Sequence, residues 1–356
     1  MERQSQRLKK VFVAVSGGVD SAVAAATLKQ AGFDCTAVYM ELYDQPAHKS
    51  EDAEKVAKHL DIPFEILDLT GQFKNVIDYF CSEYKQARTP NPCVFCNRSI
   101  KFGKLFEYAK SKGADFIATG HYAQIIEDED GFSLYAAANT TKDQSYALAM
   151  INRSVLENIL FPVGRLDKSQ TRKMAETLGL EVCNKPDSQE ICFIPDNDYA
   201  AKLESLCPEV IRQGNIIDSS GKILGTHSGI HRFTIGQRRG LRIAMGVPYY
   251  VTKLDAAQNT VTLGPDEELS HRNLTADGAS WLIDEPAEAF AALVKIRYNQ
   301  KPVSGFVTPQ KDIIKVSFDQ PVRAITPGQA VVFYLKNEKG LKVAGGAWIK
   351  GVLADG

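Results

Sequence analysis

The chain has 356 residues, of which 44% are hydrophobic and 24% are charged, and its formal net charge is −1. This length is enough for two or three hydrophobic cores, and the composition is that of globular proteins, which excludes collagen-like and disordered classes. The N-terminal stretch up to Lys10 is largely polar and the apolar run that follows, Val11 to Val15, is short, so the sequence predicts neither a signal peptide nor a membrane span. We therefore expect a cytoplasmic protein with no membrane partner.

The near-zero net charge gives no overall attraction to nucleic acid, so RNA binding would have to come from a local patch. One candidate is the segment from Ser219 to Leu254, which contains no Asp or Glu. Its basic residues are Lys222, Arg232, Arg238, Arg239, Arg242 and Lys253. This segment is either a solvated basic surface or part of a nucleic-acid site.

In chain order, the first half alternates short apolar runs with segments of helical periodicity. Strands are predicted at 11–15, 35–42, 63–69 and 115–119, and helices at 21–31, 50–60 and 101–111. This alternation implies crossover connections and therefore a parallel sheet covered on both faces, which is an α/β fold. A hairpin from 122–126 and 132–137 and helices at 143–151 and 169–178 are expected next.

After about residue 198 the helical periodicity largely disappears, and short β-like runs such as 214–225 and 248–264 are broken by Gly, Pro and Asn. Strands predicted at 293–298, 313–318, 330–335 and 341–349 suggest a small antiparallel β-barrel. These changes of pattern divide the chain into domains at 1–200, 201–276 and 277–356.

A glycine-rich loop, Ser16-Gly17-Gly18-Val19-Asp20-Ser21, follows the first predicted strand and opens the first predicted helix. Backbone N–H groups and the helix dipole can hold an anion at such a place. The loop is not a Walker A motif, because no Gly-Lys-Ser/Thr ends it, and its glycine spacing does not fit the dinucleotide fingerprint. The alternative is an ordinary turn in which Asp20 or Ser21 caps the helix.

Seven cysteines at irregular spacing argue against a structural disulfide framework. Cys93 and Cys96 form a Cys-x-x-Cys after two prolines, where a helix start can stabilise a thiolate, although half of a zinc site has the same spacing. Cys192, in an apolar stretch between Pro186 and Pro195, is by itself more typical of a core cysteine than of a nucleophile. The four cysteines interpreted as structural are Cys35, Cys81, Cys183 and Cys207.

Further motifs along the chain are Arg88-Thr89-Pro90-Asn91-Pro92, Cys96-Asn97, Ile100-Lys101-Phe102-Gly103, Ala118-Thr119-Gly120-His121-Tyr122, Lys142-Asp143-Gln144-Ser145-Tyr146, Ile191-Cys192-Phe193-Ile194 and Thr234-Ile235-Gly236-Gln237-Arg238. The glycine-rich loop resembles the signature of the PP-loop ATP pyrophosphatases, which split ATP to AMP and pyrophosphate while adenylating a substrate oxygen. Together with the other motifs, which occur in the same order over nearly the whole chain, it resembles the tRNA-specific 2-thiouridylases.

The resemblance implies a transferase that adenylates the C2 oxygen of the wobble uridine with ATP and Mg²⁺ and then replaces it with sulfur. The fold it implies is a PP-loop nucleotide-binding domain at 1–200, a central tRNA-contacting domain at 201–276 and a C-terminal antiparallel β-barrel at 277–356. Its partners would be the anticodon stem-loop of tRNA and a sulfur donor such as a cysteine desulfurase or a sulfur relay protein.

The resemblance also implies roles for individual residues. Cys192 would carry the sulfur as a persulfide, and Cys96 would help to release it by forming a disulfide with Cys192. The positions that match ATP contacts are Ala14, Val15, Ser16, Gly17, Gly18, Val19, Asp20, Ser21, Met40 and Gly120. The positions that match tRNA contacts are Asn91, Pro92, Cys93, His121, Lys142, Asp143, Gln144, Arg297, Tyr298 and Gln329.

This chain departs from the family pattern in three places. Most members carry Asp at the position of Cys93. They carry Ser-Thr-Gly where this chain has the Ser-Gln-Glu before Ile191, and their segment after Met40 is longer than in this chain. Cys93 therefore adds a third possible soft ligand to Cys96 and Cys192. The three thiolates could bind three irons of a 4Fe-4S cluster whose fourth iron holds the sulfur. Thiolation is expected by either route.

Two other classes of function remain as alternatives. One is a different PP-loop enzyme, such as a tRNA lysidine synthetase or an ammonia-using ligase, which needs no paired cysteines. The other is a non-catalytic tRNA-binding iron-sulfur protein that keeps only the fold, although such a protein would not need the complete glycine-rich loop.

Overall fold

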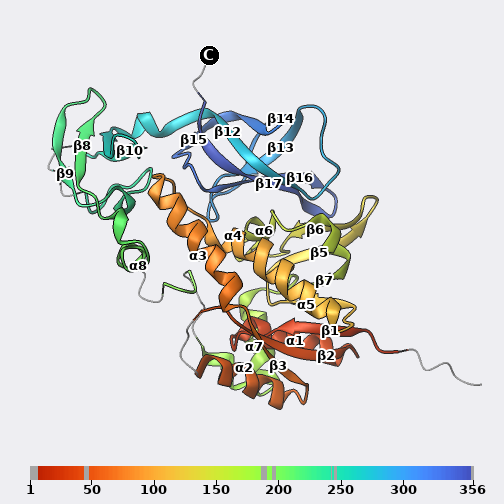
Figure 1. The fold of residues 1–356 in the computed structure, drawn as a ribbon. Helices are drawn as coiled ribbons and strands as arrows, with labels where there is room; N and C mark the ends of the chain where they lie inside the picture. Colours follow the sequence, from red (N-terminus) through yellow and green to blue (C-terminus); the bar gives the residue numbers. More distant parts are fainter. Residues whose placement is uncertain are drawn as a thin grey trace, which may run out of the picture. The chain divides into compact units, whose positions relative to one another are not determined.

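The structure is a computed structural model that describes residues 7–43, 48–185, 191–194, 198–241, 243 and 247–353 (Figure 1). The chain divides into two compact units. Unit 1 comprises Met1–Asn75, Val94–Gln189 and Lys336–Val343, and unit 2 comprises Val76–Cys93, Glu190–Leu335 and Ala344–Gly356.

Unit 1 is built on a parallel sheet of five strands in the order β3-β2-β1-β4-β7 (Figure 1). The strands are β1 (Lys10–Ala14), β2 (Asp34–Glu41), β3 (Phe64–Asp68), β4 (Phe116–Ala118) and β7 (Ile159–Leu160). β1 pairs in parallel with both β2 and β4, and its residues from Val11 to Ala14 are all buried. Such burial is typical of a central strand covered on both faces. The predicted parallel α/β sheet is confirmed.

The helices of the N-terminal half begin with α1 (Val19–Gln30), α2 (His48–His59), α3 (Thr70–Lys85), which continues from unit 1 into unit 2, and α4 (Pro92–Cys96). They continue with η1 (Asn97–Lys104), α5 (Leu105–Ser111), α6 (Ser145–Leu148), η2 (Arg153–Asn158), α7 (Lys168–Thr177) and η3 (Glu181–Asn184). Side chains of α1, α2 and α7 share one hydrophobic core with β1 and β2. No helix among the described residues is long and apolar enough to cross a membrane.

Helix α3 was not predicted, and two of the predicted helices differ from the structure. The helix predicted at 101–111 begins as a π-helix, η1, before it continues as α5. The helix predicted at 143–151 is short, because the Asp143 carboxylate accepts hydrogen bonds from the N–H groups of Ala137 and Ser145, at 3.0 Å each, and so fixes a turn at its start.

The predicted hairpin is also confirmed: β5 (Ala123–Asp128) and β6 (Gly131–Ala136) pair in antiparallel register. The segment Lys336–Val343, which belongs to unit 1, joins it by pairing Lys342 with Tyr135. The ammonium group of Lys342 lies 3.0 Å from the carboxylate of Asp128 and 2.6 Å from that of Asp130. Burial alone would raise the pKa of Asp128, but Lys342 and neighbouring hydroxyl groups outweigh it and hold this pKa at about 2.

Unit 2 begins its C-terminal part with α8 (Tyr199–Leu206), which was not predicted, followed by a four-stranded sheet in the order β10-β11-β8-β9. The strands are β8 (Gly214–Asp218), β9 (Ile223–His227), β10 (Tyr250–Asp255) and β11 (Thr260–Gly264). β11 and β8 are parallel, and the other two pairs are antiparallel. Their buried side chains form a small core of their own.

Six further strands form a closed antiparallel barrel in the order β12-β15-β14-β13-β16-β17, with β12 also paired to β17 (Figure 1). They are β12 (Ser270–Trp281), β13 (Phe290–Lys295), β14 (Val303–Gln310), β15 (Ile313–Arg323), β16 (Ala330–Asn337) and β17 (Gly340–Val352). Buried and exposed residues alternate along β15, as expected of a strand with one face in a core. The predicted barrel is confirmed, with β12 and β14 as strands that were not predicted.

Candidate functional site

The glycine-rich loop lies at the point where the strand order of the parallel sheet reverses. The chain leads from β1 to β2 and β3 on one side, whereas β4 and β7 lie on the other. Loops that leave the carboxyl ends of two such adjacent strands diverge and open a crevice for ligands. The loop of 16–21 follows β1, Gly120 follows β4, and Met40 lies near the end of β2. The predicted ATP positions of unit 1 are therefore at one edge of the sheet.

The backbone of this loop has a conformation that favours glycine. Gly17 has a φ of +74°, and a Cβ there would lie 2.8 Å from the Cβ of Asp52. The hydroxyl of Ser21 donates to the carbonyl of Gly18 at 3.0 Å and accepts from the N–H of Ser16 at 3.2 Å, so the loop is closed on itself. Gly18 is the N-cap of α1 and no side chain caps the helix. The alternative of an Asp20 or Ser21 cap is therefore wrong.

Gly120 brings the loop after β4 against the start of α1. A Cβ on Gly120 would lie 2.6 Å from the backbone carbon of Asp20 and 2.6 Å from the backbone nitrogen of Ser21. Only a hydrogen fits there, so the two loops meet through their backbones. The loop that follows β4 therefore lies directly against the first turn of α1.

The carboxylate of Asp20 is held by Tyr122, which ends the Ala118–Tyr122 motif, and by Lys168, which the sequence did not single out. The hydroxyl of Tyr122 donates to it at 2.8 Å, and the ammonium group of Lys168 lies 2.8 Å from both of its oxygens. The same Tyr122 hydroxyl lies 3.0 Å from that of Thr171, which is fully buried in α7. Asp20 is therefore oriented by groups from β4–β5 and from α7.

His121 lies beside a cation and is held neutral. Burial first, and then the neighbouring charge of Lys101, lower the pKa of His121 well below its usual value. Its Nδ1 lies 2.6 Å from the hydroxyl of Thr119, and its Nε2 lies 3.5 Å from the ammonium nitrogen of Lys101. Because that ammonium group can only donate, we assign Nε2 as the acceptor and Nδ1 as the protonated nitrogen. Lys101 comes from the π-helix η1, a form of helix that is frequent at functional sites.

The predicted tRNA contacts Lys142, Asp143 and Gln144 form a half-buried loop. The side-chain oxygen of Gln144 accepts from the N–H of Tyr122 at 2.9 Å, which connects this loop to the residue that orients Asp20. Asp143 instead holds its own turn. Unit 1 thus brings Gln144, His121 and the glycine-rich loop into one continuous set of contacts.

The cysteines of the two motifs differ in exposure. Cys93 and Cys96 both lie on α4, with Cys93 exposed and Cys96 buried. Cys192 is exposed on a turn closed by a hydrogen bond from the N–H of Ile194 to the carbonyl of Ile191 at 2.8 Å. All seven cysteines are described, and all are thiols.

The interpretation of Cys192 as a core residue, taken from its apolar surroundings, is wrong. Its neighbours Phe193 and Ile194 take the buried positions, and the ring of Phe193 packs against that of Phe80 with centroids 5.3 Å apart. Anchoring these two side chains leaves the Cys192 thiol outward. Among the described residues, which include Cys93, Cys96 and Cys192, no group of three or more His, Cys, Asp or Glu side chains is arranged to hold a metal ion.

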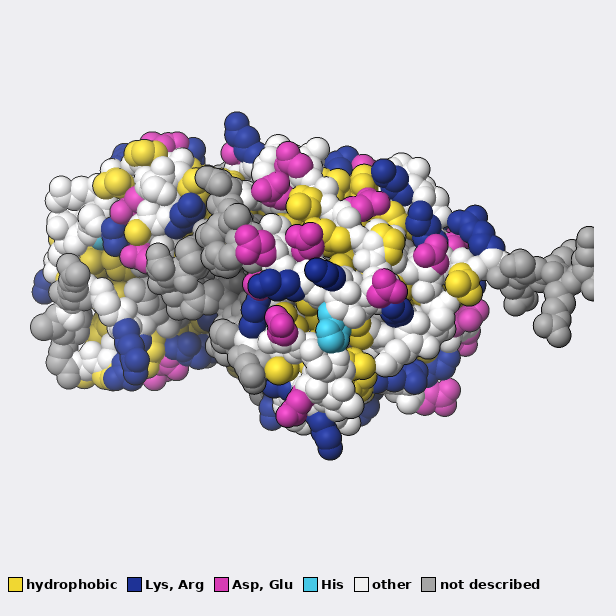
Figure 2. Space-filling model, turned by 90° about the horizontal axis from the view of Figure 1, so that it is seen from below, with side chains coloured by type: hydrophobic (Ala, Val, Ile, Leu, Met, Phe, Trp, Pro, Cys, Tyr) yellow, Lys and Arg dark blue, Asp and Glu magenta, His cyan; other side chains and the backbone are white. Residues whose placement is uncertain are grey.

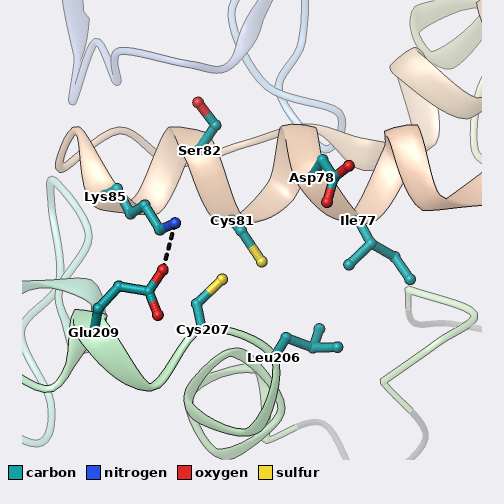
Figure 3. Close-up of a pocket in the computed structure, with 8 residues that line it drawn as sticks. All are labelled: Ile77, Asp78, Cys81, Ser82, Lys85, Leu206, Cys207 and Glu209. Carbon is teal, nitrogen blue, oxygen red and sulfur yellow. Dashed lines mark ion pairs between the residues drawn. The ribbon is translucent and has the colours of Figure 1, made fainter.

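Of the cysteines interpreted as structural, Cys35, Cys81 and Cys207 are buried and Cys183 is half-buried. Cys81 of α3 and Cys207 point toward one another in a cavity of about 400 Å³, next to an ion pair between Lys85 and Glu209 at 2.6 Å (Figure 3). Burial, followed by the neighbouring Cys207, raises the pKa of Cys81 to about 12. A thiol with such a pKa is protonated at neutral pH and is a poor nucleophile.

Unit 2 holds the other predicted tRNA contacts. Asn91 and Pro92 lie at the start of α4, and the side-chain amide of Gln329 donates to the carbonyls of Thr89 and Pro90 at 3.0 Å each. Gln329 is therefore next to the Asn91 segment. Tyr298 is 41% exposed on the barrel.

Arg297 holds three segments of unit 2 together. Its guanidinium donates to the carbonyls of Ile235 and Ala324 at 3.0 and 3.1 Å and to the hydroxyl of Thr326 at 2.7 Å. It therefore supports the protein as well as standing at a predicted tRNA position.

The segment from 219 to 254 is free of acidic residues in sequence but not in space. Glu204 pairs with Arg232, and Asp255 lies 3.7 Å from Lys253. Arg238 and Arg239 are exposed, and Arg242 lies outside the described residues. Positive and negative side chains are also interspersed on the face of the molecule drawn in Figure 2. Acidic side chains therefore offset part of the positive charge that the sequence of 219–254 suggests.

Family models match three stretches of the chain. Residues 9–196 match a tRNA methyl transferase HUP domain, residues 203–265 a tRNA methyl transferase PRC-barrel domain, and residues 271–349 an aminomethyltransferase beta-barrel domain. Together these matches follow the order of the parallel sheet, the four-stranded sheet and the barrel.

Curated relatives match over nearly the full length. The chain is 42% identical to tRNA-specific 2-thiouridylase MnmA of Clostridium perfringens over 360 residues, which cover 97% of this chain and 99% of the relative. It is 44% identical to tRNA-specific 2-thiouridylase MnmA of Syntrophotalea carbinolica over 355 residues, which cover 97% of this chain and 99% of the relative. A solved 4-thiouridine synthetase–RNA complex with bound ATP is similar only at a TM-score of 0.38 and 20% identity, over 56% of this chain and 51% of that one.

Proposed function

Because the chain belongs to the family of tRNA-specific 2-thiouridylases, we propose that it is a tRNA-uridine 2-sulfurtransferase, which replaces the C2 oxygen of the wobble uridine with sulfur at the expense of ATP. Its macromolecular substrate is the anticodon stem-loop of tRNA. The relatives favour neither a tRNA lysidine synthetase nor a non-catalytic tRNA-binding iron-sulfur protein.

The observation that carries this proposal is the contact between Gly120 and the start of α1. It places the loop after β4 directly against the uncapped N-terminus of α1, at the switch point of the sheet. Such a place suits the phosphates of ATP, because N–H groups and the helix dipole both favour negative charge. Asp20 at the first turn of α1 offers the carboxylate oxygen that Mg²⁺ prefers.

In the first step, the C2 oxygen of uridine attacks the α-phosphorus of ATP. The bond from that phosphorus to the bridging oxygen breaks, and pyrophosphate leaves with the electron pair. A uridine carbonyl is a poor electrophile, and an AMP ester at this oxygen gives C2 a good leaving group. Since the base has to leave its stack to be adenylated, contacts to the flanking RNA are required as well.

In the second step, a persulfide on Cys192 attacks C2 and AMP leaves. The Cys96 thiolate then attacks the Sγ atom of Cys192, which forms a Cys96–Cys192 disulfide and leaves the transferred sulfur on the base. A dithiol reductant restores both thiols. The exposed turn of Cys192 suits a residue that receives sulfur from a donor such as a cysteine desulfurase or a sulfur relay protein, and the buried Cys96 suits a residue protected from other oxidants.

We assign tRNA binding in unit 1 to His121, Lys142 and Gln144, which lie near the glycine-rich loop. Arg297, Tyr298 and Gln329, with the segment of Asn91, Pro92 and Cys93, form the contribution of unit 2. Reversing the exposed Arg238 and Arg239 to Glu should weaken tRNA binding and flatten its salt dependence, because fewer counterions are released. Unchanged binding with a normal salt slope would show that this stretch is only a solvated surface.

We further propose that the protein acts in the cytoplasm and that the domains 1–200, 201–276 and 277–356 have different roles. The first would bind ATP and hold Cys96 and Cys192, and the other two would contact tRNA. The persulfide route needs only Cys96 and Cys192, and we assign no step to a cluster.

The test of the proposal is tRNA-dependent release of pyrophosphate. Ser21→Ala removes the hydroxyl that closes the loop, and Asp20→Ala removes the carboxylate at its helix, so both variants should lose pyrophosphate release and thiolation while remaining folded. Ser205→Ala, which changes an exposed hydroxyl of α8, is the matched control and should retain activity. Full activity of either loop variant would contradict the assignment.

The sulfur route is tested separately with the three cysteines. Cys96→Ala and Cys192→Ala should stop turnover, whereas Cys93→Ala should keep substantial activity, because the usual family residue there is not a thiol. If a cluster held the sulfur, all three variants would be equally inactive and the protein purified without oxygen would be brown. A colourless, air-stable Cys93→Ala enzyme that still makes 2-thiouridine decides for the persulfide.

A further inference from the structure

Two lysine side chains reach the phosphate loop from distant parts of the sequence. Lys168 places its ammonium nitrogen 2.8 Å from both carboxylate oxygens of Asp20, from which it is separated by 148 residues. Lys185 donates to the carbonyl oxygen of Gly17 at 3.2 Å, across 168 residues, and also pairs with Asp52. The loop thus has two cations at its edge, although its own sequence contains none.

Both lysines are carried by one packed segment of unit 1. Lys168 is the first residue of α7, whose N-cap, Asp167, forms a capping box with Gln170. Arg172 of the same helix donates to the carbonyl oxygens of Cys183 and Lys185, at 3.0 and 3.2 Å, and so fastens the chain after η3 to α7. Ala175, Leu180 and Val182 bury this segment against α1. The positions of the two ammonium groups are therefore fixed by the core and not only by surface ion pairs.

The charge of the ligand explains why two cations are needed. ATP carries about four negative charges, whereas a helix N-terminus is equivalent to only about half a positive charge. In a Walker A loop, a lysine within the motif reaches the β- and γ-phosphates, and this chain has none there. The side chains of Lys168 and Lys185 are 16% and 38% exposed, so both can reach a ligand at the loop.

We propose that Lys168 and Lys185 bind the phosphates of ATP and neutralise the pyrophosphate that leaves. This inference rests on the proposed function and deepens it. When the bond between the α-phosphorus and the bridging oxygen breaks, negative charge develops on that oxygen, and an ammonium group directed at it stabilises the leaving group. Asp20 and Asp52 hold the two lysines in place until ATP arrives, and the carboxylate of Asp20 then becomes accessible to Mg²⁺.

The experiment compares Lys168→Gln and Lys185→Gln with Lys173→Gln, an exposed residue of the same helix. Binding of ATP, inorganic pyrophosphate and AMP is measured by calorimetry on the full chain. For each of the first two variants we expect affinity for ATP and pyrophosphate to fall about tenfold or more, as for the loss of one hydrogen bond to a charged group. Affinity for AMP, which lacks the β- and γ-phosphates, should stay within about twofold, and Lys173→Gln should bind all three ligands like the wild type.

Unchanged affinity for ATP and pyrophosphate would overturn the inference. An equal loss of AMP binding would overturn it too, because it would show that the lysines only maintain the shape of the loop. Lys168→Arg and Lys185→Arg keep the charge and should recover much of the lost affinity, which an unfolded variant could not do. If ATP binding behaves as expected but the wild type makes no 2-thiouridine, the phosphate assignment stands and the proposed function fails.

Discussion

Replacing Gly120 by Ala tests whether the close approach of two backbones builds the ATP site. The new Cβ would lie 2.6 Å from backbone atoms of both Asp20 and Ser21, and backbone cannot move aside as a flexible side chain can. Overpacking of this kind costs about 1–3 kcal/mol of folding free energy. Because the displaced atoms are the first turn of α1, we also expect the affinity for ATP to fall.

The matched control is Gly71→Ala in α3, where a Cβ would meet nothing within 4 Å. Ala is favoured over Gly within a helix by about 0.5–1 kcal/mol, so this variant should be as stable as the wild type or more stable. Urea unfolding gives the stability of both variants, and calorimetry gives their affinity for ATP. A Gly120→Ala protein with wild-type stability and wild-type ATP affinity would refute the argument that only hydrogen fits at this position.

Three further predictions follow from buried ionisable groups. Lys342→Met leaves the carboxylate of Asp128 buried without its cation, so urea unfolding should show that the free energy of unfolding falls by about 3–5 kcal/mol. Lys339→Met, at an exposed position, should change this free energy little, and equal effects of the two substitutions would contradict a special role of the ion pair. The pKa of His121 is depressed in the folded state, so as the pH falls below the unfolded-state pKa of about 6.5 only the unfolded state gains a proton. The free energy of unfolding should therefore fall by up to about 1.4 kcal/mol per pH unit. His121→Gln should remove this part of the pH dependence of stability, and an unchanged pH dependence would contradict the argument. Alkylation followed by mass spectrometry should label Cys93 and Cys192 first at neutral pH and Cys81 only as the pH approaches its pKa of about 12; early labelling of Cys81 in the folded protein would show that it is not buried.

The parts of the fold that the sequence predicted are those with local signals. The strand, glycine-rich loop and helix around Gly17 follow one another directly, so this part of the fold could be recognised from a short stretch. The alternating β5–β6 hairpin and the barrel strands β13, β15, β16 and β17 were recognisable for the same reason, whereas β12 and β14 were not predicted.

Helix α3 does have a local signal in its sequence. Its apolar residues Phe73, Val76, Ile77, Phe80 and Tyr84 recur every three or four positions, which is the period of a buried helical face. The aromatic and cysteine residues in this segment have weak helix propensity, and tertiary packing outweighs that preference. The rings of Tyr84 and Tyr199, stacked with centroids 5.5 Å apart, are one such contact.

Other features had no local signal at all. Lys168 and Lys185 reach the loop only because α7 packs on α1, and nothing in their own neighbourhood indicates a phosphate. The outward position of Cys192 depends on the burial of Phe193 and Ile194 against other segments. The acidic partners of Arg232 and Lys253 lie outside the basic stretch, so its net charge in space could not be read from its sequence.

The central claim is an ATP-dependent replacement of one oxygen by sulfur on the wobble uridine, and nucleoside mass spectrometry measures it directly. Unmodified tRNA is incubated with the protein, Mg-ATP and a sulfide or persulfide source, then digested, while pyrophosphate is measured in the same samples. The account predicts 2-thiouridine at the wobble position, formed in equal amount to pyrophosphate and absent without ATP or with Cys192→Ala. Sulfur at another atom or position, or 2-thiouridine formed without ATP, would contradict it.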